Sequence, residues 1–167
     1  MAKYVGNVKI MDARIIFRNF EGREEMYNAE GKRNFCVLLN DDIAEQLAAD
    51  GWKVKYLKPL DEGDDPTPYL KVNVQFREND GNITPNIKMV VNGRKRRITP
   101  RNAALLDTAD LESVDLIISP YDLSKRGGEG YSAWLKTLFA KTVDDELESK
   151  YASIPDDDDF YSEDFDD

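Results

Sequence analysis

The sequence predicts a mainly β protein, built as a small barrel with insertions and few helices. Three observations carry this prediction: stretches in which apolar and polar residues alternate, turn residues between those stretches, and little helical periodicity. Residues 69–77 show the alternation most clearly, because every second residue is apolar. Their apolar face carries Leu70, Val72, Val74 and Phe76, and their polar face carries Tyr69, Lys71, Asn73, Gln75 and Arg77.

The other strands follow from the same pattern. Residues 8–20 are expected to form the first one, and Asn92-Gly93 is a strong signal for a tight turn that joins strands 86–92 and 94–99 into a hairpin. Alternation along 8–20 puts Arg14, Ile16, Arg18 and Phe20 on one side and Ala13, Ile15, Phe17 and Asn19 on the other. The remaining strands are expected at 34–39, 53–60, 114–123 and 131–142.

Helical segments are short. One helix is expected over 42–50, capped by Asn40 or Asp41 and ended by Gly51. A second should begin at Thr99-Pro100 and run to about residue 109, with proline at its first position. A helical turn is expected around 144–151, and charged loops at 21–32, 61–68 and 125–130.

Composition narrows the class of protein. With 167 residues, 41% of them apolar and 34% charged, the chain suits one soluble domain with appendages. It has neither an apolar stretch long enough to span a membrane nor the start of a secretory signal. Cys36, the single cysteine, lies in an apolar stretch and is expected to be buried and inert, in a cytosolic setting. Because there is no histidine, the commonest general base and zinc ligand are missing.

The net charge of −10 hides two regions of opposite sign. Eight acids and no base lie within 155–167, so the rest of the chain carries only −2. Residues 81–106, in contrast, contain no acid and are rich in lysine and arginine. The end of the chain therefore repels polyanions, and the internal segment attracts them.

The polar face of 69–77 combines an aromatic ring, cations and amides, which suits single-stranded nucleic acid. The same face is also typical of the solvated side of a sheet, but other strands repeat the combination of rings and cations. Residues 94–97 are expected to project as a basic finger that closes on the nucleic acid bound to the barrel. Which rings stack on bases and which belong to the core stays open, for Trp134 above all. The candidate nucleic-acid-binding residues are Arg14, Arg18, Phe20, Lys53, Lys55, Tyr56, Tyr69, Lys71, Asn73, Arg77, Lys88, Arg94, Lys95, Arg96, Arg97, Arg101, Trp134 and Lys136.

Residues 152–167 are expected to form a disordered tail after a folded domain over 1–151, because like charges repel and little can be buried. Aromatic residues among the acids indicate anchors for a partner protein. The tail can also mimic a nucleic-acid strand and compete for the protein's own basic groove. The expected partner-binding residues are Asp156, Asp157, Asp158, Asp159, Phe160, Tyr161 and Phe165.

The chain resembles the single-stranded-DNA-binding proteins of tailed bacteriophages. The similarity lies in residues 34–39, 50–59, 114–121, 133–138 and 144–151 and in the acidic tail. This resemblance implies an OB-fold, a five-stranded barrel, here with an extra hairpin and short helices. It also implies a role in phage DNA replication or recombination in the host cytoplasm, with replication proteins recruited by the tail.

We therefore expect a protein that binds single-stranded DNA without sequence preference and that has no catalytic residues, metal or cofactor. One alternative is a DNA mimic that inhibits a host enzyme through its acidic tail. Another is a metal-dependent nuclease, for which Asp64 and Asp65 in the acidic loop 61–68 are the candidates, but a flexible loop does not hold carboxylates in one geometry. The oligomeric state, monomer or dimer, and the preference for DNA over RNA stay open.

Overall fold

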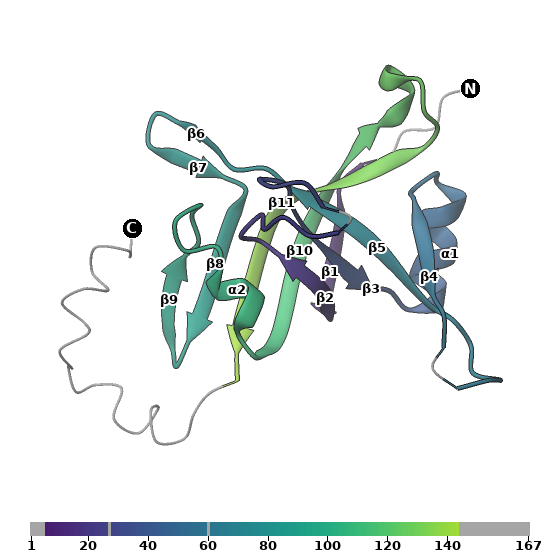
Figure 1. Ribbon diagram of the computed structural model, residues 1–167, viewed down its shortest axis with the longest axis horizontal. Helices are drawn as coiled ribbons and strands as arrows, with labels where there is room; N and C mark the ends of the chain where they lie inside the picture. The colour runs from purple at the N-terminus through teal and green to yellow at the C-terminus, as the bar shows by residue number, and fades with distance from the viewer. Residues whose placement is uncertain (1–5, 27, 60, 144–167) are drawn as a thin grey trace.

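The computed structural model describes residues 6–26, 28–59 and 61–143, and most of them lie in β-strands (Figure 1). Six strands form the main path of the sheet, in the order β1-β10-β11-β5-β3-β2. All neighbours on this path are antiparallel except β11 and β5, which are parallel. The strands are β1 (Val8–Ala13), β2 (Ile15–Asn19), β3 (Arg33–Leu38), β5 (Thr67–Val74), β10 (Leu111–Asp122) and β11 (Tyr131–Thr142).

The path closes on itself because its two end strands are consecutive in the chain. Only Arg14 separates β1 from β2, and β1 pairs with β10 while β2 pairs with β3. The two segments therefore act as one bent strand that belongs to both ends of the sheet. The result is a five-stranded OB-type barrel, which confirms the predicted fold class.

The bend makes one prediction wrong, since residues 8–20 do not alternate as a single regular strand. The register shifts between Ile10 and Ala13 and again between Ile16 and Asn19, and Phe17 has a φ of 50°. A bulge of this kind adds a residue on one strand and reverses the phase of the alternation beyond it. Phe20 consequently enters the core, where its ring stacks on Phe35 at 5.0 Å between centroids.

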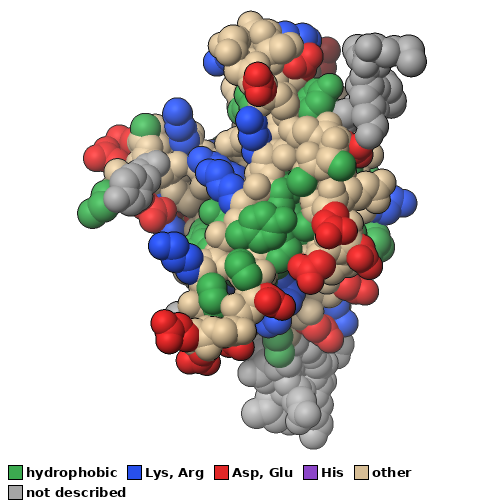
Figure 2. All heavy atoms as spheres, turned by 90° about the vertical axis from the view of Figure 1, so that its right-hand side faces the viewer, with side chains coloured by type: hydrophobic (Ala, Val, Ile, Leu, Met, Phe, Trp, Pro, Cys, Tyr) green, Lys and Arg blue, Asp and Glu red, His purple; other side chains and the backbone are tan. Residues whose placement is uncertain are grey.

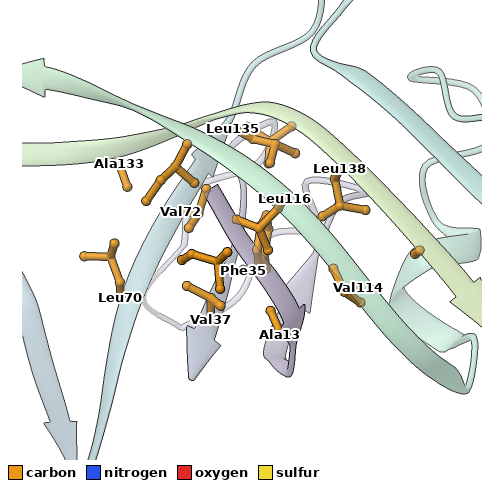
Figure 3. Close-up of a cluster of buried hydrophobic side chains, with 14 of the residues drawn as sticks. Ala13, Phe35, Val37, Leu70, Val72, Val114, Leu116, Ala133, Leu135 and Leu138 are labelled. Carbon is orange, nitrogen blue, oxygen red and sulfur yellow. The ribbon is translucent and has the colours of Figure 1, made fainter. Parts of the chain in front are cut away.

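The barrel interior is filled by aliphatic side chains from every strand of the ring (Figure 3). Val37 of β3, Leu70 of β5, Leu116 of β10 and Leu138 of β11 are all almost completely buried. These residues occupy the inward positions of their strands, and alternation in the sequence predicted this for Leu70 on the strand 69–77. Cys36 is buried as expected, with 8% of its surface exposed.

The helix α1 (Asp41–Ala49) follows β3 and precedes β4 in the chain, and the structure confirms its predicted boundaries to within a residue. The Asn40 side chain accepts a hydrogen bond from the Ile43 amide and so caps the first turn. Ala44 and Leu47 face the core, and Trp52 is buried directly after the helix, next to Tyr131. The chain then forms β4 (Val54–Leu57), which pairs with the first half of β5.

Two hairpins are inserted between β5 and β10. The predicted one joins β8 (Asn86–Val91) to β9 (Arg94–Arg97), and the positive φ angles of Asn92 and Gly93 give the turn that this dipeptide favours. The other, β6 (Arg77–Asn79) with β7 (Asn82–Thr84), was not predicted, although Asp80-Gly81 at its turn is the same kind of signal. β8 pairs in parallel with the second half of β11, beyond the point where β5 leaves it.

The expected helix from Thr99-Pro100 is much shorter, because α2 spans only Leu105–Thr108. Asn102 explains the difference: its side chain accepts from the Thr99 amide and donates to the Arg97 carbonyl, which holds 99–102 as a turn. A short 3₁₀ helix, Leu123–Arg126, lies between β10 and β11. The helical turn at 144–151, the domain boundary at 151 and the acidic tail all lie outside the described residues.

Within the described parts of the chain, no helix has the length and apolar character that crossing a bilayer requires.

The reversed phase at Phe20 can be tested with two variants on the same strand. Phe20→Ala should lower the free energy of unfolding by about 3–5 kcal/mol, because Phe20 is 0% exposed and truncation leaves a cavity. Phe17→Ala, at a residue that is 64% exposed, should change it by no more than about 0.5 kcal/mol. Urea denaturation measures both. Equal effects, or a larger one for Phe17, would contradict this register of β2.

Candidate nucleic-acid interface

The candidate interface is the outer surface of β3, β5, β4 and the first half of β11, which we call the barrel face. Residues paired across neighbouring strands lie on the same side of a sheet, so the register defines its composition. One row runs Leu38–Tyr69–Lys55, the next Ile16–Cys36–Lys71, and the third Asn34–Asn73–Trp134. Three sequence-predicted candidates on β5 (Tyr69, Lys71 and Asn73) therefore occupy successive outward positions, each in a different row.

Two cations converge at the centre of this face. Burial raises the pKa of the Cys36 thiol, and the ammonium groups of Lys71 and Lys55 oppose that rise. Both lysines are exposed; Lys71 is paired with Cys36 across the strands, and Lys55 is paired with Tyr69 in the adjoining row. Positive charge beside aromatic rings is the combination that a single-stranded polyanion with stacking bases needs.

Trp134 lies on the barrel face and not in the core. It is half-buried, its indole N–H donates to Ser132 Oγ at 3.2 Å, and its backbone pairs with Asn73. The Asn73 amide in turn donates to the Ala133 carbonyl at 3.2 Å, which fastens β5 to β11. Trp134 therefore lies next to Asn73 in the third row, with Asn34 on the far side of β5.

The turn between β10 and β11 borders the barrel face at one end. The Arg126 guanidinium lies 5.9 Å from the centre of the Tyr121 ring and donates to its hydroxyl. Gly130 lets this turn approach Gly51, because a Cβ there would lie 2.3 Å from the Gly51 carbonyl oxygen, and the side chain of Lys53 lies beside it. Tyr121 and Arg126 were missed from the sequence, since no alternation or cluster marked them.

Loop 21–32 starts next to the opposite edge of the face. Asn19 Oδ1 accepts from the amides of Gly22 and Arg23, and Asn28 Oδ1 accepts from the side chain of Asn34. These bonds attach the loop to the third row of the barrel face. The bulge on β2 also brings out Phe17, an exposed ring that the sequence pattern had assigned to the side opposite Arg14 and Arg18.

Figure 2 shows the side of the molecule that carries α1 and β4, where apolar and basic side chains lie together in the middle and acidic ones lie around them.

Three predicted site residues are not available on this face. Phe20 is inside the barrel. Arg18 donates to the carbonyls of Leu106 and Ala109 at 2.8 and 2.7 Å, so it ties β2 to α2. Tyr56 is 54% exposed but lies on the other side of β4 from Lys55, because consecutive residues of a strand point in opposite directions.

The basic hairpin β8–β9 does not close over the barrel face as expected. β8 continues the sheet along the second half of β11, where Thr137 to Lys141 pair with Asn86 to Val90. Alternation separates its cations, with Lys95 and Arg97 on the side of Lys88, and Arg94 and Arg96 on the other. The hairpin therefore extends the sheet sideways as a wing.

The remaining candidates are scattered. Arg14 is exposed at the bend between β1 and β2, and Arg77 is exposed at the base of β6, where it donates to Gln75. Lys136 is the extra residue of a bulge in β11, and Arg101 follows β9. The acids of loop 61–68 are exposed, and among the described residues no group of three or more potential ligands could hold a metal ion.

Comparison with known proteins decides the family. A family model described as a putative phage ssDNA-binding domain matches residues 1–166. The chain belongs to this family of phage single-stranded-DNA-binding domains. That membership confirms the resemblance seen in the sequence. No curated protein matches the chain.

Solved structures of the single-stranded DNA-binding protein from bacteriophage Enc34 share the fold. Its complex with ssDNA is 15% identical, with 86% of this chain and 95% of that chain covered and a TM-score of 0.52. A further structure of the same protein is 14% identical, covers 96% and 97% and has a TM-score of 0.52. A C-terminal truncation is 14% identical, covers 84% and 87% and has a TM-score of 0.51.

The burial of Cys36 predicts slow thiol chemistry. The thiolate is the nucleophile, and burial both raises the thiol pKa and limits access. At pH 8 iodoacetamide should therefore modify the native protein several-fold more slowly than the urea-unfolded chain. Mass spectrometry follows the reaction without ambiguity, since Cys36 is the only cysteine. Equal rates in the two states would contradict the burial.

Proposed function

We propose that this chain binds single-stranded DNA on the barrel face without reading its sequence. The observation that carries the proposal is the set of three cross-strand rows, which alternate rings, ammonium groups and amides on one continuous surface. Membership of the phage family supports it, as does the fold shared with a protein solved in complex with ssDNA.

Each row has a distinct part in this proposal. Tyr69 and Trp134 offer ring faces to bases, and stacking accepts any base because every base has a π-face. Lys55 and Lys71 neutralise phosphates and release counterions, which makes the affinity depend on salt. Asn34 and Asn73 supply amide groups between them, while Lys53 and Arg126 border the strand at the β10–β11 turn.

The role that follows is binding and protection of DNA, not catalysis. We place it in phage DNA replication or recombination in the host cytoplasm. The acidic tail, outside the described residues, competes for the barrel face through Asp156 to Asp159 and recruits replication proteins through Phe160, Tyr161 and Phe165.

Substitutions on the two sides of β4 and β5 test the barrel face. Tyr69→Ala should weaken binding of fluorescent oligo(dT) by about 1–3 kcal/mol, the cost of losing one stacked base. Tyr56→Ala removes a tyrosine ring that is 54% exposed on the opposite side of the sheet and should leave the affinity unchanged. Anisotropy titrations at one salt concentration compare them. Equal losses, or none at Tyr69, would refute this placement of the DNA.

A charge variant tests the phosphate contacts separately. Lys71→Gln should reduce the slope of log affinity against log salt by about 0.7, the value for one phosphate contact on a single strand. Titrations at four or more salt concentrations give the slope. Lys9→Gln, at an exposed position of β1, is the matched loss of one positive charge away from the barrel face. If both variants change the slope equally, the effect comes from net charge alone.

Removal of the acidic tail tests whether it competes with DNA for the barrel face. A chain ending at Ile154 should bind oligo(dT) more tightly than the full chain at low salt, and the difference should shrink as salt screens the tail. The same titrations measure it. Equal affinities at low salt would show that the tail does not occupy the barrel face.

A further inference from the structure

The second half of β11 carries an aromatic ring, Phe139, that lies outside the barrel face. Phe139 is 44% exposed on the outer side of β11, so its ring is accessible from solvent. Its neighbours across the strands are Asp115 of β10 on one side and Lys88 of β8 on the other, and Lys88 is paired with Arg97 of β9. We call the row Phe139–Lys88–Arg97 the wing face.

The charges around Phe139 are distributed unevenly. Toward β10 lie acids: Asp115, whose carboxylate accepts from the Asp12 amide at 2.9 Å, and Glu112, which pairs with Lys141 at 3.3 Å. Toward β8 and β9 every charged outward residue is basic, because residues 81–106 contain no acid. A polyanion that covered Phe139 would therefore extend toward the hairpin and not toward β10.

A surface hollow continues the row beyond β9. Arg97 and Arg101 line it, together with Ile83, Gly81 and Glu78 from the β6–β7 hairpin. Arg97 also donates to the Ile83 carbonyl at 3.4 Å, so its guanidinium lies where the wing face meets the hollow. The wing face thus presents one ring from β11 and two cations in line with it, and Arg101 adds a third cation across a hollow that Glu78 also lines.

We propose that the wing face is a second contact surface for single-stranded DNA, on which a base stacks on Phe139 and the following phosphates pair with Lys88, Arg97 and Arg101. This inference rests on the proposed function, because the same strand reaches both surfaces. The outer side of β11 connects them, because Phe139 lies five positions after Trp134, about 17 Å along an extended strand. The basic wing thus lengthens the binding site beyond the barrel face.

Oligonucleotide length separates the two surfaces. OB folds contact about 4–16 nucleotides, so oligo(dT) of about 5 nucleotides fits the barrel face alone and one of about 20 covers both. Phe139→Leu keeps an apolar side chain but removes the ring, and should weaken binding of the long oligonucleotide by about 5- to 150-fold while leaving the short one unchanged. Phe139→Trp, which keeps a stacking ring, should retain the affinity of the native protein.

The charge of the row gives an independent readout. Lys88→Gln should lower the salt slope for the long oligonucleotide only, by about 0.7. Thermal unfolding of each variant should match that of the native protein, since Phe139 and Lys88 point away from the core.

Tyr69→Ala distinguishes this inference from the proposed function, because it should weaken both oligonucleotides. If Tyr69→Ala does so and Phe139→Leu affects neither, the wing face is refuted and the barrel face stands. If neither oligonucleotide binds the native protein, both proposals fail. If Phe139→Leu instead abolishes a dimer seen by sedimentation without DNA, the wing face is a contact between copies of the chain, and the proposed second DNA surface is wrong.

Discussion

The bend in the first strand is the constraint on which the rest of the structure depends. The sheet closes into a barrel because the bent strand β1–β2 pairs with β10 through its first half and with β3 through its second half. To do so, it must change direction at Arg14. Bulges on either side of the bend provide the turn, and the bulge in β2 sends Phe20 into the barrel while it exposes Phe17. Closure, core composition and the edge of the barrel face therefore follow from one local irregularity.

The second organising feature is the division of β11 between two partners. Its first half pairs with β5 and its second half with β8, both in parallel. A barrel strand of twelve residues is long enough to belong to the barrel and to extend beyond it. The bulge at Lys136 marks the change, so that Trp134 lies on the barrel face and Phe139 on the wing. One strand thus connects two surfaces of different charge density.

The positive charge of the protein is arranged by this topology. Lys55 and Lys71 lie among rings and amides at the centre of the barrel face, whereas the dense cluster 94–97 is divided between two sides of a hairpin. A run of four cations in the sequence is therefore not one patch in space. In the proposed function, the separated cations would follow an extended polyanion along its backbone, which a single concentrated patch would do less well.

Much of the molecule could be predicted from local patterns, because period-two alternation, a helix cap and an Asn-Gly turn each act within a few residues. The sequence by itself determined β5 with its polar face, the capped α1, the β8–β9 hairpin and the burial of Cys36. Only the tertiary structure decided that Phe20 is buried and that Arg18 donates hydrogen bonds to carbonyls of α2 and its C-cap. It also decided that Tyr56 points away from the barrel face and that Phe139 lies beside Lys88. The physical reason is twofold. A bulge shifts the phase of the alternation by one residue, and parallel pairing joins β8 to β11, 51 residues further along the chain, without leaving a signal in either segment.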